Sequence, residues 1–98
     1  MSNTVKKYND FFLEKKFELT NLLQKKDFKS ANECLSCMRI TLGEFIVEYE
    51  WLLTNICNCN YTSKDKNSLY KIGTMNIFID IFKKIILECE CIYSNFTD

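Results

Sequence analysis

Proline is absent from this chain of 98 residues, and glycine occurs only twice, at Gly43 and Gly73. These are the residues that end helices and shape the tight turns between short strands. A chain almost without them is expected to form long, uninterrupted helices. Apolar residues make up 47% of the chain and include eight Phe, which is enough bulky material for one buried core. A chain of this length rarely builds two cores, so we expect a single helical domain over residues 1–98.

The spacing of apolar residues predicts three helices, at residues 4–26, 31–58 and 66–93. In each segment apolar residues recur at intervals of three and four, which places them along one face, and only Lys15 and Lys16 interrupt this spacing, in the first segment. The resulting seams are Val5, Tyr8, Phe12, Leu19 and Leu22 in the first segment, Leu35, Met38, Leu42, Phe45, Tyr49, Leu52 and Ile56 in the second, and Ile72, Met75, Ile79, Phe82, Ile86, Cys89 and Tyr93 in the third. The predicted fold is therefore all-α, an antiparallel bundle of three long helices.

Two polar stretches predict the connections between these helices. The sequence from Ser30 to Glu33 fits a capping box, in which the serine and the glutamate satisfy each other's backbone amides, so the second helix is expected to begin near Ala31. The stretch from Asn58 to Asn67 is rich in turn-forming residues, and Thr62 to Asp65 offers a second cap.

The third helix has more apolar residues than two neighbours can cover. Ile77, Ile81 and Leu87 lie outside its seam and its flanks. A helix that is apolar over most of its circumference is either buried centrally or covered by another molecule. We therefore expect a homo-oligomer, with dimerisation completing the bundle, or a larger protein partner.

Composition excludes several classes of function. No histidine is present, which excludes imidazole in acid–base catalysis, in Ser-His or Cys-His nucleophilic sites and in metal sites. Thirteen basic residues balance thirteen acidic ones, and only one of the basic residues is arginine, so nucleic acid is not an expected partner. No apolar run approaches the ~20 residues that cross a bilayer, so no membrane is expected either. The first ten residues lack the apolar stretch of a secretory signal, which favours a reducing, cytoplasmic location.

Six cysteines fall into three close pairs, of which Cys57 and Cys59 suggest no function. An antiparallel pairing of the second and third helices would bring Cys34 opposite Cys91 and Cys37 opposite Cys89. Four thiolates at one level are a possible tetrahedral zinc site. However, residues 89 and 91 lie about 200° apart around a helix and do not share a face. Reduced cysteines without a cofactor are therefore the main expectation, and structural zinc or thiol redox chemistry is the alternative.

The second helix carries the candidate binding residues. Trp51, the only tryptophan, lies off the seam with Glu44 one heptad before it, and Glu48 lies one turn from Glu44. Aromatic anchors contribute much of the energy of protein interfaces, so these three residues are the candidate contact patch. The alternatives are that Trp51 packs under the first helix and that the two carboxylates form a solvated face.

These observations predict a protein–protein interaction module rather than an enzyme, with no catalytic residues and no cofactor. The bias toward Lys, Asn, Ile and Phe is typical of a low-GC genome. Small helical proteins of phages, viruses and mobile elements often act as inhibitors or adaptors, and by analogy this class is the functional hypothesis.

Overall fold

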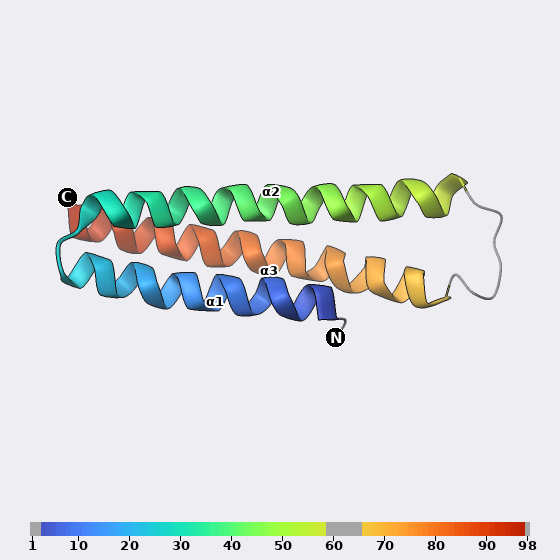
Figure 1. Cartoon of the computed structure of the whole chain (residues 1–98), viewed down its shortest axis with the longest axis horizontal. Coiled ribbons are helices and arrows are strands. Elements are labelled where there is room, and N and C mark those ends of the chain that lie inside the picture. Colours follow the sequence, from blue (N-terminus) through green and yellow to red (C-terminus); the bar gives the residue numbers. More distant parts are fainter. Residues whose placement is uncertain (1–2, 59–65, 98) are drawn as a thin grey trace.

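The computed structural model describes residues 3–58 and 66–97, and confirms the all-α class and the bundle of three helices. These are α1 (Asn3–Gln24), α2 (Phe28–Asn58) and α3 (Lys66–Thr97). Each helix packs against both of the others, and the molecule is a rod of 54 × 20 × 16 Å. Helix α2 runs antiparallel to its neighbours, whereas α1 and α3 are parallel (Figure 1).

The core is built mainly from the three predicted seams, together with Leu23, Ala31 and Cys34, which lay outside them. Phe12, Phe45 and Phe82, one from each helix, are completely buried. The Phe12 and Phe82 rings stack with centroids 4.4 Å apart, and Phe45 meets Phe82 edge-on at 5.0 Å. Cys89 and Met75 of α3 are also fully buried, as the seam of the third helix predicted. The described residues include no buried polar side chain, so the interior is held by apolar packing alone.

The first connection differs from the predicted capping box. Helix α2 begins at Phe28 rather than near Ala31, because Asp27 caps it: the Ser30 amide donates to Asp27 Oδ1 at 3.2 Å, and the Ala31 amide donates to the Asp27 carbonyl. Helix α1 ends in a Schellman motif, in which the amides of Lys26 and Asp27 donate back to Leu23 and Leu22. Lys26 has a φ of 62°, a conformation that normally favours glycine.

Of the other boundaries, the end of α2 and the start of α3 match the predicted residues, α1 differs by one or two residues at each end, and the end of α3 differs by four. Helix α3 continues to Thr97 instead of ending at residue 93, and the Thr97 hydroxyl donates to the Tyr93 carbonyl at 3.0 Å. The predicted cap from Thr62 to Asp65 lies outside the described residues. No helix in the described part of the chain is long and apolar enough to cross a membrane.

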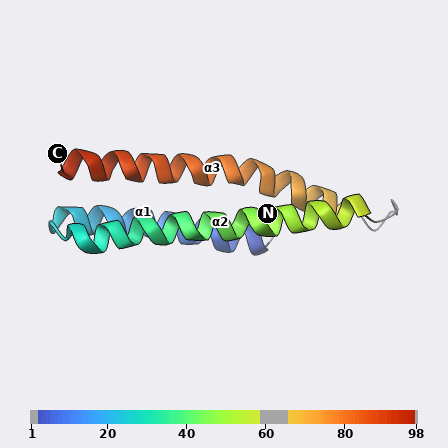
Figure 2. The same cartoon turned by 90° about the horizontal axis from the view of Figure 1, so that it is seen from above.

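The helices differ in length, and this difference shapes the surface. Helices α2 and α3 have 31 and 32 residues, whereas α1 has only 22. Helix α1 therefore begins part-way along the α2–α3 pair, whose far end has no third helix beside it (Figure 1). Viewed from above, α3 lies over the layer formed by α1 and α2 and approaches α2 toward this end (Figure 2).

Candidate functional site

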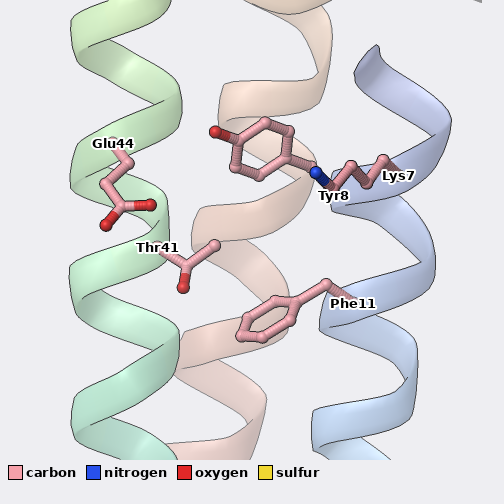
Figure 3. A pocket seen from close by; sticks show the side chains of 5 residues that line it. All are labelled: Lys7, Tyr8, Phe11, Thr41 and Glu44. Carbon is pink, nitrogen blue, oxygen red and sulfur yellow. The ribbon is translucent and has the colours of Figure 1, made fainter. Parts of the chain in front are cut away.

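The three candidate contact residues lie along the groove between α1 and α2. Glu44 borders a hollow of about 230 Å³ that is closed on the α1 side by Lys7, Tyr8 and Phe11. Figure 3 shows the Tyr8 and Phe11 rings reaching from α1 toward α2, where Thr41 and Glu44 stand on the opposite wall. The groove thus has an aromatic wall from one helix and a polar wall from the other.

Tyr8 joins the two walls. Its ring lies 4.8 Å from the ring of the buried Phe45, and its hydroxyl donates a hydrogen bond to Glu48 Oε1 at 3.3 Å. Burial raises the pKa of the Tyr8 hydroxyl, and the negative charge of Glu48 and the hydrogen bond to it raise the pKa further. Tyr8 therefore remains a neutral donor and holds the Glu48 carboxylate at the groove.

Trp51 occupies the end of the groove where α1 begins. It borders a pocket of about 370 Å³ together with Glu48, Leu52, Thr4 and Lys71, which come from all three helices. The Trp51 side chain is 66% exposed, so it does not pack under α1 as the alternative interpretation held. An exposed tryptophan beside a pocket is the kind of anchor found at the centre of protein interfaces.

Trp51 is exposed because α1 is short. The side chain lies at the level of Thr4, near the first residue of α1, and beyond that level α2 and α3 have no third helix to cover them. Tyr70, on α3 at the same end of the rod, is 69% exposed. Neither Tyr70 nor Lys71 was a candidate from the sequence, although the unequal lengths of the predicted helices already implied an uncovered end.

The charge of the groove is uneven. From Ile40 to Asn58, α2 contains three glutamates and no lysine or arginine. Within the described residues neither Glu44 nor Glu48 forms an ion pair, so their charges remain available to a ligand. Both carboxylates are exposed, as expected for a solvated face.

The candidate metal-binding thiols are divided between core and surface. Cys34 and Cys89 are buried in the hydrophobic core, whereas Cys37 and Cys91 are exposed. Cys34 Sγ donates to the Lys15 carbonyl at 3.5 Å. Burial raises the pKa of the Cys34 thiol and raises that of Cys89 to about 11, so both are neutral thiols at neutral pH.

The zinc hypothesis gains no support from this geometry. No group of three or more cysteine, aspartate or glutamate residues in the described segments is placed to hold a metal ion. Cys34 and Cys37 do border one hollow of about 370 Å³, next to the Lys15–Glu18 ion pair. Cys59 lies outside the described residues, as does the side chain of Cys57.

In comparisons with known proteins, no family model, curated protein or solved structure matches this chain.

Proposed function

We propose that this chain is a non-enzymatic protein-binding module, and that its binding surface is the α1–α2 groove with Trp51 as the anchor. The observation that carries the proposal is the exposure of Trp51 at the border of a pocket. Exposure of a large apolar side chain to water is unfavourable in free energy, and a partner that covers the side chain removes this penalty. Glu44 and Glu48 follow along the same groove and would orient the partner.

The charge of α2 defines the kind of partner. A segment that presents lysine or arginine to Glu44 and Glu48, and an apolar side chain to the Trp51 pocket, is complementary to this wall. Charge complementarity mainly sets the orientation and the association rate, whereas the buried aromatic anchor sets the dissociation rate. Such a module acts by occupying a partner's surface, as an inhibitor or an adaptor in the cytoplasm does, and a low-GC phage, virus or mobile element is its proposed source.

A photo-cross-linking experiment tests this surface directly. A benzoylphenylalanine is placed at position 51, at position 44 or, as the control, at position 87. Leu87 is 62% exposed, similar to Trp51, but lies on α3. After irradiation in cells of the source organism, positions 51 and 44 should yield the same cross-linked protein, and position 87 should not. Equal cross-linking from position 87, or none from position 51, would refute the proposal.

Affinity measurements then test whether Trp51 and Glu48 contribute to binding of the partner. Trp51→Ala with Glu48→Lys should weaken binding of the cross-linked partner by at least about 100-fold, as expected for the loss of a central aromatic residue. The control, Leu87→Ala with Lys83→Glu, removes an exposed apolar side chain and reverses one charge, in the opposite direction, on α3. A folded Trp51 and Glu48 variant that keeps full affinity would exclude the groove as the binding site.

A cysteine-based function is the second candidate, favoured by the shared position of Cys34 and Cys37 beside one hollow. We propose for this case a thiol switch at that hollow, in which oxidation joins the two thiols. Treatment of the wild-type chain with an oxidant should then lower its mass by two hydrogens, and replacing Cys34 and Cys37 with serine should abolish that change. An unaltered wild-type mass after oxidation would exclude the switch.

A further inference from the structure

A second exposed apolar surface lies on the opposite side of α1, where α1 meets α3. Four residues form it, and we call it the α1–α3 strip. Phe17 is 71% exposed and Leu13 51% on α1, while Ile77 is 61% and Ile81 37% on α3. None of these residues borders the Trp51 pocket.

The ion pair between Lys16 and Glu88 locates the strip. Lys16 Nζ lies 2.6 Å from Glu88 Oε2, so Glu88 marks the side of α3 that faces α1. Ile81 lies seven residues before Glu88, and Ile77 eleven, which are close to two and three full helical turns. Both isoleucines therefore share the line of Glu88 along α3.

The α1 half of the strip follows from the same contacts. Leu13 precedes Lys16 by three residues, and Phe17 lies four residues after Leu13, so both are on the outer edge of the α3-facing side. The stacking of Phe12 on Phe82 fixes the relative height of the two parallel helices. In order along the rod the strip then reads Ile77, Ile81, Leu13 and Phe17, over roughly 15 Å.

The charges beside the strip differ in kind from those of the α1–α2 groove. Helical spacing places Asp10 and Lys6 three and seven residues before Leu13, and Lys84 three residues after Ile81. The Lys16–Glu88 ion pair lies at the Phe17 end, so charges of both signs are present beside the strip. The exposed face of α2 beside Trp51 has glutamates and no basic residue. Two copies of α2 in contact would bring like charges together, whereas two copies of the α1–α3 strip would not.

We propose that the α1–α3 strip binds a second copy of this chain, making a homodimer through α1 and α3. The strip provides an apolar centre flanked by charges of both signs, so that in a two-fold interface, where the same patch meets itself, opposite charges can pair at the rim. The dimer would cover Ile77 and Ile81, which the bundle itself leaves in water. The Trp51 groove would stay open, so this proposal does not depend on the proposed function.

Sedimentation equilibrium of the purified, reduced protein tests the proposal. The wild-type chain should be a dimer at micromolar concentration, and Phe17→Asp with Ile77→Asp should raise the dimer dissociation constant by at least about 100-fold. The control is Val47→Asp, because Val47 is 63% exposed on α2 and should leave the dimer unchanged. A wild-type chain that is monomeric at 200 μM, or a double variant that dimerises like the wild type, would overturn the proposal.

Two further variants control for other causes of dimer dissociation. The first tests whether the chain has unfolded, and the second tests whether the dimer forms through the Trp51 groove instead. Phe17→Gln with Ile77→Gln removes the same apolar surface with better helix formers, and circular dichroism verifies that it is folded. It should dissociate like the aspartate variant, and an intact dimer would contradict the proposal. Trp51→Ala should leave the dimer mass unchanged. If this variant were monomeric, the dimer interface would lie at the Trp51 groove and not at the α1–α3 strip.

Discussion

Removing the Phe82 ring should cost about 4 kcal/mol of the free energy of unfolding. Phe82 is completely buried, and its ring contacts Phe12 at 4.4 Å, Phe45 at 5.0 Å and Phe78 at 5.6 Å. Phe→Ala changes in cores typically cost ~3 to 5 kcal/mol, and the loss of three ring contacts favours the upper half of that range. Domains of this size are stable by roughly 5 to 15 kcal/mol, so Phe82→Ala should be folded but close to its limit.

Urea denaturation followed by circular dichroism measures this loss. At about 1.5 kcal/mol per M of urea, the midpoint should fall by roughly 2.7 M. Phe96→Ala is the matched control, because Phe96 is 45% exposed near the end of α3 and should cost less than about 1 kcal/mol. Both are measured at one protein concentration, since association would itself raise stability. Equal shifts for the two variants would refute the central place of Phe82 in the core.

Three further predictions concern the caps, the backbone and a buried thiol. In urea titrations, Asp27→Ala should lower the free energy of unfolding by about 1 kcal/mol, and Ser30→Ala by much less. The reverse order would show that Ser30, and not Asp27, caps α2. Lys26→Gly and Gly43→Ala should each stabilise by up to about 1 kcal/mol, because Lys26 has a positive φ and a Cβ on Gly43 meets open space; destabilisation by either would contradict this. Folding raises the pKa of Cys89 from 9.0 to about 11, so the protonated thiol favours the folded state. Its contribution to the free energy of unfolding is complete below pH 9 and is lost as the pH rises toward 11. The wild-type free energy of unfolding should therefore fall about 2 kcal/mol more than that of Cys89→Ala over this range, and parallel profiles would exclude the effect.

The helical pattern predicted the core well because burial in a bundle follows directly from periodicity. Every seam residue of α3 from Ile72 to Cys89 is buried. The start of α2 could not be predicted as well, because Ser30 and Asp27 are both good caps and the choice depends on the turn before them. That turn places Lys26 at a positive φ, where a glycine would have been the usual sequence signal.

The exposure of the candidate residues was predictable from the sequence, but their arrangement in space was not. Periodicity placed Trp51 and Glu44 off the core seam, and both line the α1–α2 groove. The hydrogen bond from Tyr8 to Glu48 depends on how α1 is rotated and shifted against α2, which no single helix encodes. The same holds for the thiols, since a correct antiparallel pairing still left Cys37 and Cys91 on the surface.

Native mass spectrometry of the protein purified gently from its own cells tests the binding function most directly. The wild-type chain should carry a partner protein of reproducible mass, and the variant with Trp51→Ala and Glu48→Lys should lack that mass while keeping its own oligomeric state. A wild-type spectrum without any partner, or an identical complex with the variant, would contradict the assignment of this groove as a protein-binding site.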